Sequence, residues 1–122
     1  MTQQIIIATG AIFGMLSVIF GAFGAHALKK ILSEDQLHSF EVGVKYQMYH
    51  AIVLLCLGLN ANYGTSEIYW CFTIGIILFS FSIYGLILSD AKEKKLRFLG
   101  PITPIGGLLL VSGWLLLLIN AF

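Results

Sequence analysis

The chain has 122 residues, of which 58% are hydrophobic and only 11% are charged, and its formal net charge at pH 7 is +1. Roughly a quarter of the residues of an ordinary soluble domain are charged, and a domain of this size buries only about two-thirds of the surface of its unfolded chain. The apolar surplus therefore excludes a water-soluble domain, and the near-neutral charge argues against nucleic acid as a partner.

Four hydrophobic segments follow one another, at about residues 5–28, 42–59, 68–88 and 99–122. The first contains no charged side chain and, at ~1.5 Å per residue, is long enough to cross a hydrocarbon core of ~30 Å. A short polar linker joins the second and third segments, so we expect these helices to be antiparallel neighbours. The sequence predicts one domain over the whole chain, an all-α integral membrane four-helix bundle with up-down connectivity. Such connectivity would place the first and fourth spans side by side.

Small residues recur in the first segment at intervals of four, three, four and three. Small side chains on one helix face let two helix backbones approach closely. We expect this stripe to pack within the bundle, and the alternative is an interface between copies of the chain. The stripe consists of Gly10, Gly14, Ser17, Gly21 and Gly24. Weaker sets occur in the third and fourth segments, at Gly75, Ser82, Gly85 and Ser89, and at Gly106, Gly107 and Gly113.

A helix start signal follows the first segment. Ser33 and Gln36 have the spacing of a capping box, and Glu34 and Asp35 place acidic side chains in the first helical turn. The sequence predicts a short helix at the membrane interface that runs into the second span. An ordinary connector is the alternative.

The seven basic residues fall in two short segments, each between an odd-numbered span and the next. Basic loops stay in the cytoplasm. The cytoplasmic loops are therefore predicted to be residues 29–41 and 90–98, with both chain ends outside, in a bacterial inner membrane or a plasma membrane. We expect the basic side chains to set this topology and to contact the headgroups of anionic phospholipids. They are Lys29, Lys30, Lys45, Lys92, Lys94, Lys95 and Arg97.

Polar residues gather at the predicted cytoplasmic ends of the spans. Tyr46, Gln47 and His50 share one face of the second span, and His26 lies near the end of the first. Ionisable side chains inside a membrane tend to face the bundle interior, so His26, Gln47 and His50 could form a polar cluster. Whether the two histidines meet depends on the order of the helices. The candidate lipid- or ligand-binding residues are His26, Tyr46, Gln47, His50, Pro101, Thr103 and Pro104.

Two prolines mark the start of the fourth span. Pro101 and Pro104 lack an amide donor, and each restricts the residue before it. If the helix starts near Pro104, its free amides could bind an anion such as a lipid phosphate. The preferred interpretation is a turn at Gly100 and Pro101, with Thr103 as the helix cap.

The sequence offers little support for metal or catalytic chemistry. His26 and His50 have no third ligand beyond His38 and Glu41, so no metal site is predicted. No cofactor and no catalytic residue are predicted either.

The two cysteines do not form a redox motif. Cys56 and Cys71 lie in different spans, and the chain has no Cys-x-x-Cys pair. We expect both to be buried structural residues.

Three sequence blocks carry a resemblance to a known family: Gly21–Leu28 (GAFGAHAL), Tyr46–Ala51 (YQMYHA) and Gly100–Gly107 (GPITPIGG), with Trp114 after them. Together, and in this order, they resemble the YgdD/YwdK-like small membrane proteins, which are bacterial inner-membrane proteins with relatives in eukaryotes. That family is classed as a domain of unknown function. The resemblance implies a four-span membrane protein and adds no reaction. Its motif positions are His26, Gln47, His50, Pro101, Thr103 and Pro104, to which no role is attached.

Two classes of function remain after these exclusions. The preferred hypothesis is a noncatalytic membrane component that binds phospholipid, a membrane-protein partner or a second copy of itself, and that affects envelope integrity. The alternative is a small transporter or a lipid-modifying protein that uses the polar cluster of His26, Gln47 and His50. The sequence leaves enzymatic activity open and favours its absence.

Overall fold

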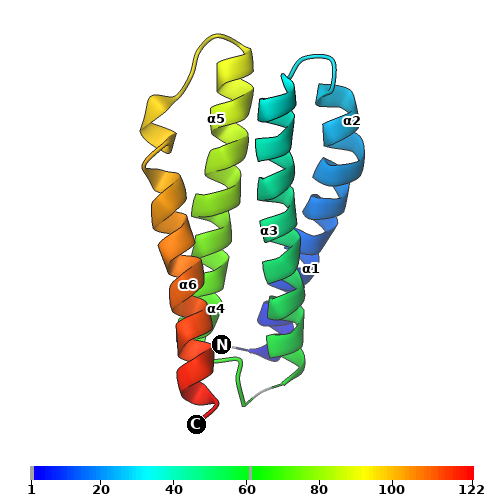
Figure 1. Cartoon of the computed structure of the whole chain (residues 1–122). Coiled ribbons are helices and arrows are strands. Elements are labelled where there is room, and N and C mark those ends of the chain that lie inside the picture. Colours follow the sequence, from blue (N-terminus) through cyan, green and yellow to red (C-terminus); the bar gives the residue numbers. More distant parts are fainter. Residues whose placement is uncertain (1, 61) are drawn as a thin grey trace.

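The structure, a computed structural model of the chain, describes residues 2–60 and 62–122, so Met1 and the linker residue Ala61 lie outside the described residues. Each of the four long helices runs antiparallel to the one before it in the chain (Figure 1), and each is long and apolar enough to cross a membrane. The described residues contain no strand. The predicted all-α four-helix architecture is confirmed. Both connections that carry basic residues lie at one end of the bundle, here called the basic end, and both termini lie at the other (Figure 1).

The first two long helices begin at side-chain caps. Helix α1 (Gln3–Val18) starts after Thr2, whose hydroxyl accepts a hydrogen bond from the backbone amide of Ile5. It continues through the π-helical segment η1 (Ile19–Gly24) into α2 (Ala25–Leu28).

Helix α3 (Glu34–Leu59) begins at the predicted capping box, which is confirmed: the hydroxyl of Ser33 accepts from the amide of Gln36, and the side chain of Gln36 accepts from the amide of Ser33. The predicted interfacial helix is thus the first part of one continuous helix.

The third and fourth long helices are also not α-helical throughout. The third consists of α4 (Ser66–Ile76), the π-helical segment η2 (Ile77–Phe81) and α5 (Ser82–Ala91). A short 3₁₀ turn, η3 (Arg97–Leu99), leads into α6 (Ile102–Asn120).

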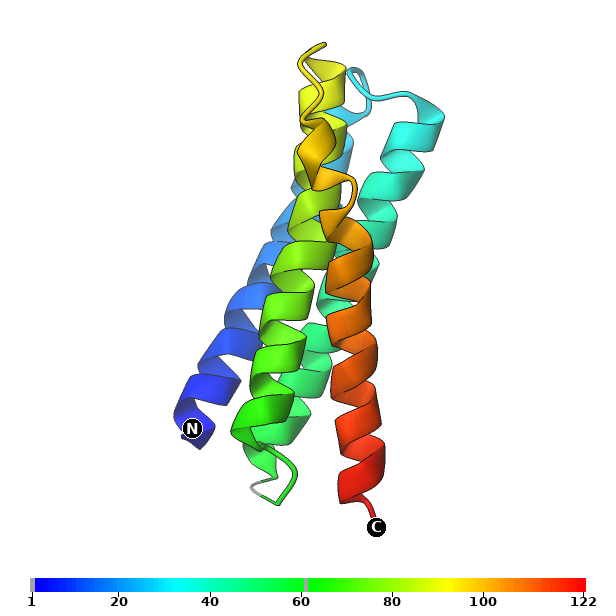
Figure 2. The ribbon, with the colours of Figure 1, turned by 90° about the vertical axis from the view of Figure 1, so that its left-hand side faces the viewer.

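The up-down connectivity is as predicted, but one expected pair of neighbours is absent. Helix α1 packs on α3, α6 packs on α4 and η2, and α3 contacts the third long helix. Figures 1 and 2 show α1 and α6 on opposite sides of the bundle in two perpendicular views. The expectation that the first and fourth spans lie side by side is therefore wrong. The reason is that the small residues of each outer helix face its sequence neighbour.

The stripe of the first span lies against α3. A methyl group added at Gly10 would lie 2.9 Å from the carbonyl oxygen of Ala51, and one at Gly24 would lie 3.4 Å from the ring of Phe40. Close approach of the two backbones at Gly10 leaves no room for a side chain. The stripe of small residues in the first span therefore packs against α3 of the same chain.

The fourth span packs on the third in the same way. A methyl group at Gly106 would overlap the backbone of Phe79, and one at Gly113 would lie 2.7 Å from the ring of Phe72. The neighbouring Gly107 is different, because its added methyl group would meet the Phe79 ring at 3.6 Å, an ordinary van der Waals distance.

Two apolar clusters form the interior. The larger lies toward the termini, and its members include Ile6, Leu54, Ile68, Phe72 and Ile76. The smaller lies at the basic end and contains Leu32, Phe40, Tyr84 and Ile87. The buried polar side chains of Gln47 and Ser80 lie between the two clusters.

The two adjacent glycines of α6 provide a test of this packing. We expect Gly106→Ala to lower the free energy of unfolding by about 1–3 kcal/mol, because overpacking forces the backbones of α6 and η2 apart. Gly107→Ala has room for its methyl group and should leave stability unchanged or slightly raised, since alanine favours helix. Thermal unfolding of both variants in the same detergent measures the difference. Equal stability of the two variants would contradict the described contact between α6 and η2.

Candidate functional site

Gln47 is the centre of a buried hydrogen-bond network. Its side chain is fully buried, and its Nε2 donates to the backbone carbonyl of Phe13 at 2.9 Å. The hydroxyl of Tyr84 donates to its Oε1 at 2.7 Å. The amide thus joins α3 to α1 and to α5, and both of its ends are occupied. It acts as a structural connection rather than a free ligand-binding group.

Two further hydroxyls join helices near this network. Ser80, fully buried in η2, donates to the carbonyl of Gly43 at 2.7 Å. The hydroxyls of Ser82 and Thr103 hydrogen-bond to each other and connect α5 to α6. In hydrocarbon such bonds matter because an unpaired polar group has no water to contact.

His50 is held by two neighbours. The indole Nε1 of Trp114 donates to its Nε2 at 3.1 Å. Because an indole can only donate, Nε2 must be the acceptor, and Nδ1 then carries the proton and donates to the carbonyl of Tyr46 at 2.6 Å. This assignment makes His50 a neutral imidazole with both nitrogens in use. Sequence analysis did not find Trp114 as its partner, although a tryptophan in a membrane segment signals a donor that needs an acceptor.

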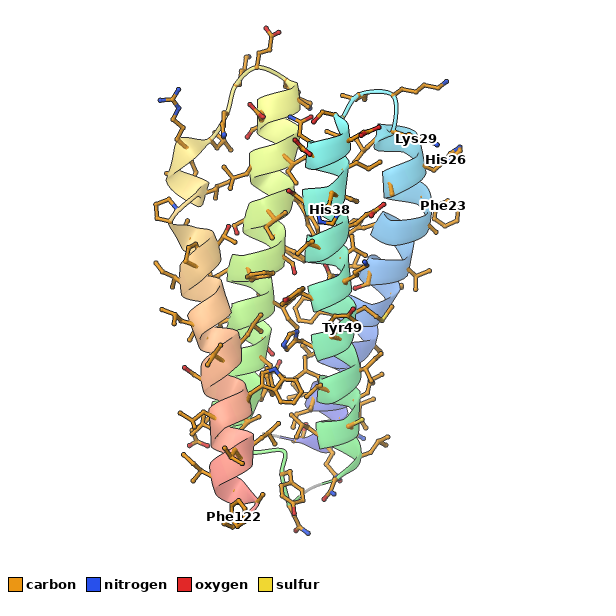
Figure 3. The ribbon with its side chains drawn as sticks, in the orientation of Figure 1. Phe23, His26, Lys29, His38, Tyr49 and Phe122 are labelled. Atoms are coloured by element: carbon orange, nitrogen blue, oxygen red, sulfur yellow. The ribbon has the colours of Figure 1, made fainter. Side chains whose placement is uncertain are left out.

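His26 does not join the other polar residues. It is exposed on α2, and Figure 3 shows its side chain at the outer edge of the bundle, pointing away from α3. Gln47 and His50 bond to other partners, as described above. The structure therefore does not assemble the cluster of His26, Gln47 and His50 considered from the sequence, because α2 turns that face of the first span outward.

The start of the fourth span also differs from the prediction. Gly100 and Pro101 form a turn, as expected, but α6 begins at Ile102 rather than near Pro104. The predicted cap is wrong: no side chain caps this helix, and the hydroxyl of Thr103 contacts Ser82 instead. Both prolines fit within the first turn, where a helix needs no amide donor.

An open groove separates α3 from α6. Its part nearer the basic end is a cavity of about 440 Å³ whose walls come from α3, α5 and the start of α6. The next part is a cavity of about 520 Å³ between α3, η2 and α6. Pro104 lines both, so they adjoin. We call the two cavities together the α3–α6 groove. The residues of α3 that line it are Ser39, Val42, Tyr46 and His50.

A smaller cavity of about 280 Å³ lies between the first span, α3 and α5. Apolar side chains such as Phe20, Leu28 and Leu88 line it. It offers space but few polar groups.

The basic side chains are all exposed, and Lys92, Lys94 and Lys95 lie in the connection between α5 and α6. This connection also exposes Leu96 and Phe98, with 65% of the Phe98 surface accessible. Basic and apolar residues that alternate in this way are typical of a segment at the boundary between headgroups and acyl chains.

The cysteines and candidate metal ligands give no site in the described part of the chain. Both thiols are free, and Cys56 is exposed on α3 while Cys71 is half-buried, so the expectation of two buried cysteines is wrong. No group of three or more His, Cys, Asp or Glu side chains lies close enough to hold a metal ion in residues 2–60 and 62–122.

Comparison with known proteins assigns the family. A family model described as "Protein of unknown function (DUF423)" matches residues 20–107. The chain belongs to this family.

Similar full-length relatives are called UPF0382 membrane proteins. One from Staphylococcus haemolyticus is 42% identical over 98% of this chain and 97% of its own. One from Staphylococcus saprophyticus is 39% identical over 98% of both chains, and one from Schizosaccharomyces pombe is 39% identical over 89% of this chain and 94% of its own. No solved structure matches the chain.

These matches, together with the four apolar helices, make the protein a multi-pass integral membrane protein. The predicted resemblance to a family of small membrane proteins of unknown function is confirmed. The matches name that family DUF423 or UPF0382 and do not carry the YgdD/YwdK name.

The Gln47 network makes a quantitative prediction. Tyr84→Phe leaves Oε1 of Gln47 unpaired, and Gln47→Leu leaves the hydroxyl of Tyr84 unpaired, so each should lower the free energy of unfolding by about 1–2 kcal/mol. The double variant should cost less than the sum of the two single changes, with a coupling of about 0.6–1.7 kcal/mol. Denaturant unfolding in mixed micelles measures the cycle, and strictly additive effects would show that the two side chains do not interact.

Proposed function

We propose that the protein is a noncatalytic component of the cell membrane that binds an anionic phospholipid at its basic end and thereby contributes to the integrity of the envelope. The observation that carries this proposal is the adjacency of the α3–α6 groove to the basic connection between α5 and α6. The lipid would place one acyl chain in the groove and its phosphate near that connection.

Charge supports the headgroup part of the proposal. Arg97 opens η3, and three residues later Gly100 lines the groove. Lys94 and Lys95 precede it in the same exposed connection. A basic side chain near an anionic membrane surface contributes about 1 kcal/mol of attraction, and an arginine can also pair with phosphate through two parallel hydrogen bonds.

The walls of the groove support the acyl-chain part. The cavity nearer the basic end is lined mainly by Val42, Ile83, Leu86, Ile87 and Pro104, with Ser39 and Thr103 as its hydroxyl-bearing residues. Apolar walls suit a hydrocarbon chain, and the polar groups lie on the residues of α3 and α6 nearest the basic end. This distribution matches a lipid whose polar part lies at the bundle end.

The pairing of the polar side chains favours binding over catalysis. The side-chain amide of Gln47 is hydrogen-bonded to Phe13 and Tyr84. The imidazole of His50 is hydrogen-bonded to Trp114 and Tyr46. A proton relay or a lipid-modifying reaction through His26 would need it beside these residues, and it is exposed on another helix. The transporter or lipid-modifying alternative has no such support.

In the proposed orientation the basic end faces the cytoplasm and both termini face outward. The support is the retention of basic loops in the cytoplasm. The proposed lipid would then belong to the cytoplasmic leaflet, whose surface carries the anionic headgroups.

Native mass spectrometry of protein released from gentle detergent tests the lipid site. The protein should retain phosphatidylglycerol in preference to phosphatidylcholine, and Lys95→Gln/Arg97→Gln should weaken that retention about 30-fold, because two charges of about 1 kcal/mol each are lost. Lys29→Gln/Lys30→Gln is the matched control. It removes the same charge at the same end of the bundle, beside the first span, and should keep the lipid.

Equal retention of both lipids, or equal loss in both variants, would contradict a specific site beside the groove. Because basic residues can also set topology, a reporter fused to the C-terminus must show the same orientation in both variants and in the parent protein.

A further inference from the structure

The α3–α6 groove ends where its two helices are bonded to each other. Among the residues that line the groove, His50 lies furthest from the basic end on α3, and Trp114 lies furthest on α6. The same two residues form the hydrogen bond between the helices, with 3.1 Å from the indole Nε1 to the imidazole Nε2. The groove is therefore open toward the basic connection and bridged at its other end.

A cluster of three rings fills the space at this bridged end. The ring of Phe72, fully buried on α4, lies 5.5 Å from the ring of His50 and 5.5 Å from that of Trp114. The rings of His50 and Trp114 are 5.9 Å apart. Gly113 lets α6 come this close, because a methyl group there would lie 2.7 Å from the Phe72 ring. Rings packed at these distances obstruct a hydrocarbon chain that runs along the groove from the basic end. We call them the ring cluster.

The length of the groove matches one acyl layer of a membrane. Its lining runs from Ser39 to His50 on α3. On α6 it runs from Thr103 to Trp114, and each stretch is about 16 Å long by helical rise. A hydrocarbon core of ~30 Å contains two acyl layers, so one layer is ~15 Å deep. An acyl chain of ordinary length that enters at the basic end would reach the ring cluster and stop there.

We propose that the ring cluster of His50, Phe72 and Trp114 selects the bound phospholipid by the length of its acyl chain. The inference rests on the proposed anionic-lipid site and adds the chemical class of its hydrocarbon part. A chain of ordinary length, such as oleoyl, fills the groove from the basic connection to the ring cluster. A longer chain must bend out of the groove, and a shorter chain leaves the far part unfilled. Both lose contacts with the lining, because a gap in packing forfeits dispersion attraction.

The far part of the groove can be shortened without a change in the core. Val111 lines the groove about one helical turn before Trp114, and its side chain is 62% exposed. A larger side chain at this position fills the far part of the groove from its open side. Removal of the Trp114 ring has the opposite effect, because it opens the ring cluster. The two changes should therefore shift the preferred chain length in opposite directions.

Native mass spectrometry of protein in gentle detergent measures this preference. The probes are three phosphatidylglycerols with the same headgroup and increasing chain length: dimyristoleoyl, dioleoyl and dierucoyl. The readout is the retention of the short and of the long lipid, each relative to the dioleoyl lipid. Because each lipid partitions into the detergent equally for every variant, a change in these ratios between variants reports the groove.

Trp114→Ala should raise the ratio of dierucoyl to dioleoyl lipid about fivefold, because the longer chain can continue past the opened ring cluster instead of bending away. Trp70→Ala is the matched control. Trp70 is 49% exposed on α4 and lies outside the groove lining, so its removal should leave the ratio at the parent value. Equal ratios in the two variants would overturn the assigned role of Trp114.

Val111→Phe should raise the ratio of dimyristoleoyl to dioleoyl lipid about fivefold, since the added ring leaves room for the shorter chain alone. Leu118→Phe is its control, because Leu118 is 59% exposed on the same helix and lies outside the lining. The ratio in this control should stay at the parent value. This pair leaves the ring cluster intact, so it decides the proposal even where Trp114→Ala fails to fold. An unchanged ratio in Val111→Phe would overturn length selection.

Failure of this inference differs from failure of the proposed function. If the parent protein prefers phosphatidylglycerol to phosphatidylcholine while every variant keeps the chain-length ratios of the parent, the anionic-lipid site stands and length selection is overturned. If the parent protein shows no preference for phosphatidylglycerol, both are overturned, because length selection rests on that site.

Discussion

A polar group buried in hydrocarbon must find its partner within the protein, and the arrangement of the helices depends on this constraint. The amide of Gln47 meets it by bonding to the first span at Phe13 and to the third at Tyr84. A shift of one helix by a single residue would leave those groups unpaired. The network therefore sets how three helices are positioned relative to one another along the bundle axis. It lies between the two apolar clusters.

Glycine contacts decide which helices pair closely. Gly10 brings α1 against α3, and Gly106 brings α6 against η2. Helix α1 therefore packs closely on α3, and α6 packs closely on the third long helix, while the α3–α6 groove stays open. In the described part of the chain, one hydrogen bond crosses the α3–α6 groove, from Trp114 to His50. The close packing of two helix pairs and the open groove between them have the same cause.

The groove presents two different kinds of surface along its length. Near the basic end it adjoins exposed lysines and an arginine, where attraction to anionic headgroups is strong. In the middle it has an aromatic wall formed by Tyr46, His50, Phe79 and Trp114. The anionic phospholipid proposed above would place its phosphate at the first surface and an acyl chain along the groove.

Local sequence signals predicted much of the fold. Apolar segments long enough to cross a bilayer specify four helices by length and composition, and Ser33 with Gln36 specifies where α3 begins, because a capping box needs only neighbouring residues. The π-helical segments η1 and η2 were not predicted. In η2 the hydroxyl of Ser80 donates to the carbonyl of Gly43, a residue far away in the chain, so the sequence alone does not indicate that contact.

The candidate site was less predictable for the same reason. The sequence identified Gln47 and His50 as polar residues that need partners, but it could not choose Tyr84 and Trp114 as those partners. It also grouped His26 with them, although the structure turns that residue to the outer surface (Figure 3). The sequence by itself determined the class of protein, the four helices and the positions of its charges, because these follow from composition and local spacing. Only the tertiary structure decided the order of the helices, the partners of the buried polar groups and the groove, because these depend on which helix faces can approach closely.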